Sequence, residues 1–139
     1  MLIDVTAQPV SRDGHSYLRI KVPARIANLF AANRLMTAQV DALWDTGATN
    51  TSIPMGTAIA LGLPLREETD TYMATSEGKA HYCSFHIIFP DGRGLIVKEG
   101  NAVPGLNSPL IIGMDIICQG ITTITPLPGG AVRLTFDLR

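Results

Sequence analysis

The sequence predicts an all-β domain, mainly antiparallel, with one or two short helices. Runs rich in β-branched residues alternate with short turns that contain Gly, Pro or Asp, the pattern of strands joined by hairpins. Residues 35–44 alternate between polar and apolar side chains, as in a strand with one face on a core. Only residues 54–62 and 114–119 are expected to form helical turns.

The first predicted element is a hairpin. Residues 12–14, Arg-Asp-Gly, form a turn signal between two apolar, β-branched runs at residues 1–10 and 15–22. The second run is expected to continue towards Ile26, and residues 28–33 are expected to connect it to the next strand.

A long strand and a short helix follow. The strand, residues 35–44, has one almost wholly apolar face, formed by Met36, Ala38, Val40, Ala42 and Trp44. The helix is expected at residues 54–62, because Pro54 suits the first helical position and Gly62 suits the exit.

Three more hairpins and one short apolar strand complete the prediction. The hairpin turns are expected at residues 75–79, 90–94 and 126–130. Residues 110–112 are expected to be a short, fully apolar strand that ends at a glycine. The sequence shows no linker and no repeat, so residues 1–139 are expected to form a single domain, long enough for a sizeable core.

Composition argues against several classes of protein. The formal net charge is −1 and no run of Lys or Arg occurs, which argues against a nucleic-acid binder. No apolar stretch approaches the roughly 20 residues that span a bilayer, and the N-terminus lacks the features of a signal peptide. The protein is therefore expected in the cytoplasm, without a membrane partner. Cys83 and Cys118 are too few for a disulfide framework and are expected to be buried thiols.

Two short motifs stand out together. Residues 45–49, Asp-Thr-Gly-Ala-Thr, follow the alternating strand, and residues 111–113, Ile-Ile-Gly, lie far downstream before the second helical stretch. Between them, residues 73–82 are expected to form a hairpin with a small tip, Ser-Glu-Gly. With Trp44 before the first motif and Gly-Met-Asp-Ile-Ile at residues 113–117, this arrangement resembles the retropepsin-like aspartic proteases, especially their bacterial single-domain members.

The resemblance covers most of the chain, from about residue 35 to the C-terminus, and it implies a closed acid-protease barrel that works as a homodimer. In that family the Asp-Thr-Gly turn supplies the catalytic carboxylate, the second motif crosses beneath it, and the hairpin at residues 73–82 is a flap over the substrate. The resemblance implies a catalytic loop (Asp45, Thr46 and Gly47), substrate-binding positions (Ala48, Thr49, Asn50, Ser76, Glu77 and Gly78) and a support beneath the loop (Ile111, Ile112 and Gly113).

The implied reaction is hydrolysis of peptide bonds by an aspartic endopeptidase. It needs two carboxylates that share one proton and hold a water molecule, because two like charges so close cannot both be ionised. The chain has only one Asp-Thr-Gly, so Asp45 must meet Asp45′ of a second copy on a two-fold axis. By resemblance, residues 1–5 and 134–139 are expected to pair across that interface. The expected partners are a second copy and a peptide or protein substrate, and no cofactor or metal is expected.

The sequence departs from the retroviral members at two positions. Those members carry an Arg after the second glycine and an Asp four residues beyond the catalytic one, whereas this chain has Met114 and Thr49, so the support of the dimer must come from elsewhere. Ala48 stands where pepsins have a Ser that lowers the pKa of the carboxyl group. We therefore expect activity at mildly acidic to neutral pH.

Other interpretations compete with this one. Asp45 could be a turn residue whose side chain caps Gly47; a phosphoryl-accepting role fits the neighbouring residues poorly. His81, Cys83 and His86 invite a metal site, but alternate strand positions do not bring all three together. No sequence signal places a His beside Cys118 to make it a nucleophile. The main alternative function is a peptide-binding or assembly module of the same fold with little or no proteolytic activity.

Overall fold

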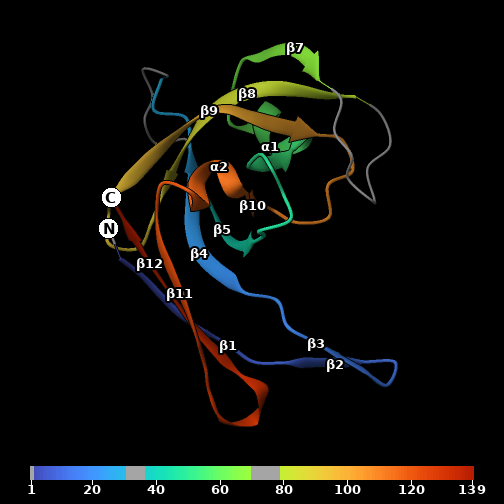
Figure 1. The fold of residues 1–139 in the computed structure, drawn as a ribbon. Helices are drawn as coiled ribbons and strands as arrows, with labels where there is room; N and C mark the ends of the chain where they lie inside the picture. Colours follow the sequence, from blue (N-terminus) through green and yellow to red (C-terminus); the bar gives the residue numbers. More distant parts are fainter. Residues whose placement is uncertain (1, 31–36, 70–78) are drawn as a thin grey trace.

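Two sheets that differ in size organise the chain. In a computed structural model, which describes residues 2–30, 37–69 and 79–139, six strands pair in a closed barrel (Figure 1). In pairing order these are β4 (Lys21–Ala27), β5 (Thr37–Trp44), β10 (Ile111–Ile112), β6 (Ser52–Pro54), β9 (Gly94–Val103) and β8 (Ala80–Ile88). β4 also pairs with β8, which closes the barrel, and β7 (Leu65–Thr69) lies on the other end of β8.

A smaller sheet extends from one end of the barrel (Figure 1). Its strands pair in the order β1 (Leu2–Ala7), β12 (Val132–Leu138) and β11 (Gly120–Pro126), all antiparallel. A short 3₁₀ turn, Pro128–Gly130, connects β11 to β12. The hairpin of β2 (Val10–Arg12) and β3 (His15–Tyr17) links this sheet to the barrel.

Alternating side chains decide which face of each strand is buried. On β5, Ala42 and Trp44 are buried while Gln39 and Asp41 are exposed, as expected for a strand with one face on a core. β4 alternates in the same way and includes Pro23. Proline is tolerated there because β8 pairs only with residues 25–27, so no described neighbouring strand needs the missing N–H group.

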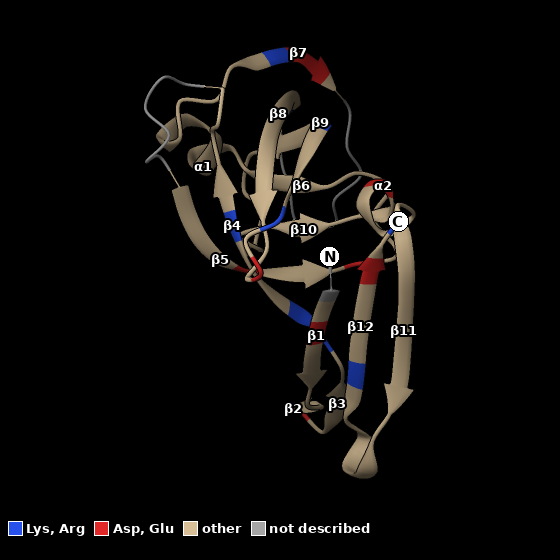
Figure 2. Ribbon diagram, turned by 90° about the vertical axis from the view of Figure 1, so that its left-hand side faces the viewer, with Lys and Arg blue, Asp and Glu red and all other residues tan. Residues whose placement is uncertain are grey.

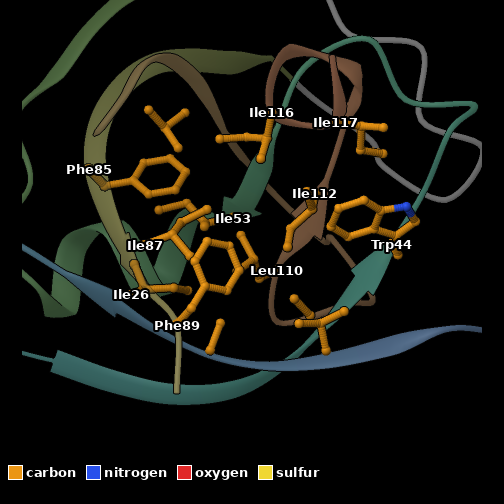
Figure 3. Close-up of a cluster of buried hydrophobic side chains, with 14 of the residues drawn as sticks. Ile26, Trp44, Ile53, Phe85, Ile87, Phe89, Leu110, Ile112, Ile116 and Ile117 are labelled. Carbon is orange, nitrogen blue, oxygen red and sulfur yellow. The ribbon is translucent and has the colours of Figure 1, made fainter. Parts of the chain in front are cut away.

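The core fills the barrel and continues under the smaller sheet. Its largest fully buried side chains include Phe85, Phe89, Leu110 and Ile112 (Figure 3). Fully burying a side chain of this size stabilises a fold by about 1.5–3 kcal/mol. Trp44 lies at the edge of this cluster and packs edge-to-face on Phe136 of β12, with ring centroids 5.1 Å apart. The core therefore joins the end of β5 to the smaller sheet.

Most predicted elements are confirmed. The hairpin turns at residues 12–14, 90–94 and 126–130 connect paired strands, and the short apolar strand and helical turns near residues 110–117 are present as β10 and α2 (Met114–Ile117). The predicted turn at residues 75–79 falls largely outside the described residues. Its flanking strands β7 and β8 pair from Thr69 and Ala80.

Three predictions about local structure were wrong. The run at residues 1–10 is not one strand, because β1 pairs with β12 while β2 turns back on β3. The helix α1 (Met55–Ala60) begins after Pro54, which is its N-cap in an extended conformation. β7 was not expected from its polar sequence; it runs along β8 and is mostly exposed.

One further expectation was wrong, and another is contradicted for residues 134–138 only; both bear on function. Cys118 is exposed, because it follows the last turn of α2 on the outer side, whereas Cys83 is buried as expected. The terminal segments pair with each other within the chain, residue 3 opposite residue 136 and residue 5 opposite residue 134. Because β11 takes the other edge of β12, residues 134–138 have no edge left for a second copy.

Candidate active site

Asp45 lies where β5 leaves the barrel. Its N–H donates to the Ile112 carbonyl at 3.0 Å, and the N–H of the preceding residue, Trp44, donates to the Ile20 carbonyl at 2.9 Å. These two hydrogen bonds fix the backbone at residues 44 and 45. They also satisfy the two N–H groups, which need partners when buried or half-buried. The carboxylate is half-buried, more exposed in the single chain than its apolar approach suggested.

A tight turn follows and fixes the orientation of the carboxylate. The Gly47 N–H donates to Asp45 Oδ1 at 2.8 Å, and the Ala48 N–H donates to the Asp45 carbonyl at 3.2 Å. A Cβ on Gly47 would lie 3.2 Å from the same Oδ1, so glycine permits this close approach. The turn cap that competed with a catalytic role is therefore present, and it leaves the carboxylate accessible.

The second motif crosses directly beneath this turn. The Met114 N–H donates to the Ala48 carbonyl at 2.8 Å, and the Asp115 N–H donates to the Thr49 carbonyl at 3.1 Å. A Cβ on Gly113 would lie 2.8–2.9 Å from backbone atoms of residues 48 and 50. The two segments can pass this closely only because residue 113 has no side chain, and backbone hydrogen bonds join them at this crossing.

Thr51 and Asp115 tie the two segments together, and neither was predicted as a site residue. The buried Thr51 hydroxyl donates to Asp115 Oδ1 at 2.6 Å and accepts the Gly113 N–H at 3.1 Å. The Thr51 N–H donates to Asp115 Oδ2 at 3.0 Å. Hydrogen bonds to a carboxylate are stronger than neutral ones. The available sequence signal was a polar residue close to each motif, which single-sequence patterns do not separate from ordinary surface residues.

A shallow hollow with both polar and apolar lining adjoins the candidate acid. A pocket of about 270 Å³ is lined by Leu18, Arg19, Ile20, Leu43, Trp44 and Asp45. Four of these side chains are apolar, and the carboxylate lies at their edge. Residues 18–20 could not be predicted as site residues from the sequence, because their segment between β3 and β4 carries no motif.

The predicted site residues divide into three groups. Residues 45–50 and 111–113 come together as described, with the support buried and the loop half-buried or exposed. Thr46 is exposed, which leaves its side chain available to a second chain. Ser76, Glu77 and Gly78 lie outside the described residues, as does most of the expected flap.

The residues considered for a metal site or a nucleophile have other partners. His81 Nδ1 bonds the Arg66 carbonyl at 2.8 Å, and His86 Nδ1 accepts the Leu29 N–H at 3.4 Å. Burial lowers the pKa of His86 and raises the pKa of the Cys83 thiol. Within residues 2–30, 37–69 and 79–139, no three His, Cys, Asp or Glu side chains form a group that could hold a metal ion. No helix in those ranges has the length and hydropathy needed to cross a membrane.

Comparison of the structure with solved structures supports the predicted fold. It is similar to the crystal structure of a retropepsin-like aspartic protease from Rickettsia conorii, with a TM-score of 0.58 and 18% sequence identity over 100% of this chain and 95% of that chain. The mainly β architecture with two short helices matches the resemblance that the motifs predicted. Neither the protein-family models nor the curated proteins compared with the sequence gave a match.

Proposed function

We propose that this protein is an aspartic endopeptidase in which Asp45 and Asp45′ of two copies activate a water molecule. The observation that supports the proposal most directly is the construction of the Asp45 loop. A half-buried carboxylate is oriented by the Gly47 N–H, and a second segment far along the chain braces the turn through backbone bonds at residues 112–115. A turn residue on a surface loop does not need such support.

The proposed chemistry uses the two carboxylates in different protonation states. One Asp45 takes a proton from the water as the water attacks the peptide carbonyl, while the other, protonated, donates to the carbonyl oxygen. In each chain the Gly47 N–H would hold Oδ1, so that Oδ2 is left to face the water. Thr46 and Gly47 would shape the loop, and Ile111, Ile112 and Gly113 would support it.

The hollow at residues 18–20 gives the proposed substrate a first requirement. The apolar part of its lining, Leu18, Ile20 and Leu43, would suit an apolar side chain next to the bond that is cut. Ala48 would contribute backbone beside the substrate, and Thr49 and Asn50 would contact the substrate main chain through their side chains. The Ala48 N–H and the carbonyls of residues 48 and 49 already bond within the protein. Ser76, Glu77 and Gly78 would cover the substrate from the flap.

The decisive test is cleavage of a peptide library by the purified protein from pH 3.5 to 7.5, read by mass spectrometry. Asp45→Asn keeps an oxygen that can accept the Gly47 N–H, so the loop should keep its shape while cleavage is lost. Asp41→Asn is the matched control, because Asp41 is an exposed aspartate on β5, the strand that leads to Asp45. This variant should cleave peptides as the parent does.

Each result has a clear meaning. Cuts made by the parent and by Asp41→Asn, and not by Asp45→Asn, would support the proposal. Cuts that persist in Asp45→Asn would overturn it. No cuts by a protein that is dimeric in solution would favour a peptide-binding or assembly module of the same fold. A rate maximum near pH 2 would contradict the expected range of mildly acidic to neutral pH.

A further inference from the structure

The outer edge of β11 is an unprotected strand edge. β11 is the last strand of the smaller sheet, and no described strand pairs with its outer side. Its residues, Gly-Ile-Thr-Thr-Ile-Thr-Pro, include no charge, and Figure 2 shows no charged position along it. Ile121 and Ile124 are 51% and 50% exposed. Proteins usually protect such an edge with charges, so an uncharged, β-branched edge indicates that something pairs with it.

The opposite edge of the same sheet differs. There, β1 carries Asp4, which forms an ion pair with Arg133 of β12 through a hydrogen bond from Arg133 Nε at 2.8 Å. Figure 2 shows a charged position on β1 and charged positions on β12. A charged edge strand is poorly suited to pairing with another chain. Of the two edges of the smaller sheet, β11 is therefore the one prepared for a partner.

Hydrogen bonds at the two ends of the hairpin determine which backbone groups point outward. The Arg139 N–H donates to the Gln119 carbonyl at 3.2 Å, and the Leu127 N–H donates to the Ala131 carbonyl at 2.8 Å. Bonded and non-bonded pairs alternate along an antiparallel ladder. Odd-numbered residues of β11 therefore bond to β12, and Gly120, Thr122 and Ile124 direct their N–H and carbonyl groups to the outer edge. Pro126, which has no N–H, closes this row with a carbonyl alone.

The smaller sheet packs, through one face, against the strand that leads to the candidate acid. Trp44, which precedes Asp45, packs on Phe136, and Phe136 lies directly opposite Thr122 of β11. Figure 3 shows the indole nitrogen of Trp44 on the side turned away from Ile112. The buried Trp44 Nε1 and the Thr122 hydroxyl have no hydrogen-bond partner among the described residues. Buried polar groups normally have one, so two unsatisfied atoms mark this side of the sheet.

We propose that β11 pairs with β11 of a second copy, antiparallel, about a two-fold axis through Thr123. This inference rests on the proposed function and names how its two chains meet. In this register Thr122 bonds to Ile124′, Gly120 bonds to the Pro126′ carbonyl, and Thr123 faces Thr123′. The strand's uncharged sequence is compatible with itself in this arrangement, and the missing N–H of proline falls at the end of the ladder.

The proposed interface explains how two chains can meet although β1 and β12 pair within one chain. The two small sheets join edge to edge into one continuous sheet, and no terminal strand is exchanged. Because Trp44 and Phe136 connect β11 to the Asp45 loop, the same axis would bring the two loops towards each other. Dimer formation then depends on a single strand pair, so it should respond strongly to changes at its centre.

A pair of cysteine variants tests the register. Thr123→Cys and Thr125→Cys are made in a Cys118→Ser background, which removes the exposed thiol. Both threonines are exposed and lie on the same face of β11. In the proposed dimer the two 123 positions form a non-hydrogen-bonded pair with Cα atoms about 4.5 Å apart, within disulfide range. The two 125 positions are offset by four residues, about 13 Å.

When treated with oxidised glutathione, Thr123→Cys should form a covalent dimer that is lost on reduction. Thr125→Cys should form no covalent dimer under the same conditions. Cross-linking at both positions, only at 125, or at neither would overturn the proposed register. As a second measurement, Thr123→Lys and Thr123→Glu should each be monomeric by analytical ultracentrifugation and should form a dimer when mixed. Thr6→Glu, on β1, should leave the dimer intact; loss of the dimer by this change alone would place the interface at β1 and overturn the proposal.

The same variants separate the interface from the function. Cross-linked Thr123→Cys that does not cut peptides would support the interface while contradicting the protease proposal. Peptide cleavage that depends on Asp45, without a cross-link at position 123, would support the protease and contradict the interface.

Discussion

Gly113→Ala tests whether the close crossing beneath Asp45 is essential. The added Cβ would lie 2.8 Å from the carbonyl carbon of Asn50 and 2.9 Å from the Ala48 and Asn50 oxygens, all backbone atoms that no rotamer change can move. The backbone of Gly113 is extended, with φ −99°, so alanine suffers no conformational strain and the effect comes from space alone. Overpacking of this kind costs about 1–3 kcal/mol.

Separation of the segments also weakens the hydrogen bonds of the crossing. The bonds from Asp45 N–H to Ile112 and from Met114 N–H to Ala48 are 3.0 and 2.8 Å long, and each contributes about 1 kcal/mol. We therefore expect the free energy of unfolding, measured in urea, to fall by about 2–4 kcal/mol. If the proposed function holds, peptide cleavage should fall on the order of 100-fold, since small displacements of a catalytic group have large effects.

Gly56→Ala is the matched control. Gly56 lies within α1, and a Cβ there would meet nothing within 4 Å. Alanine should stabilise the helix by about 0.5–1 kcal/mol. If the free energy of unfolding of Gly113→Ala lies within about 0.5 kcal/mol of the parent's, the crossing is not tightly packed and the reasoning is wrong.

Three further predictions concern other parts of the molecule. Thr51→Val should lower the free energy of unfolding by about 2–3 kcal/mol, because it leaves the buried Gly113 N–H without a partner and removes the hydroxyl bond to Asp115 Oδ1. Thr51→Ser should keep most of this stability, and equal losses in the two variants would contradict this role. An alkylating reagent at pH 8 should modify Cys118 in the native protein and Cys83 only after unfolding, because burial shields the latter and raises its pKa; modification of both at equal rates would be the contrary result. Burial lowers the pKa of His86, so the unfolded chain binds its proton first: stability should be full above pH 6.5 and should fall as the pH drops from there towards the folded-state pKa. In urea titrations at several pH values, His86→Gln should flatten that slope, and an unchanged slope would exclude His86 as its source.

The sequence predicted the fold well where local patterns decide the structure. Alternation identified the buried face of β5, and Gly-containing turns identified three hairpins, because strand period and turn chemistry depend on near neighbours. The strand β7 could not be predicted in this way, because it is polar on both faces and its pairing with β8 decides its conformation. The bounds of β1 were predicted wrongly for a related reason, since its partner β12 is distant in the sequence.

The candidate site was predictable only in its motifs. Asp45 and the Gly113 segment were identified, and the structure brings them together. The bonds that join them through Thr51 and Asp115 could not be predicted, because they link side chains 64 residues apart without a distinctive local pattern. The exposure of Cys118 depends on which way a single helical turn faces, which four residues do not specify.

The crossing of residues 112–115 beneath residues 45–49 has a consequence for the order in which the protein can acquire its site. During synthesis the Asp-Thr-Gly turn leaves the ribosome long before the segment that holds it. Until residue 115 has emerged, the Asp45 N–H and the carbonyls of residues 48 and 49 lack their partners, so nothing braces the turn that orients the carboxylate. A nascent or truncated chain therefore carries the motif without the site. Contacts so distant in sequence form slowly, so no such chemistry can begin before the second segment has been synthesised and has folded back beneath the turn.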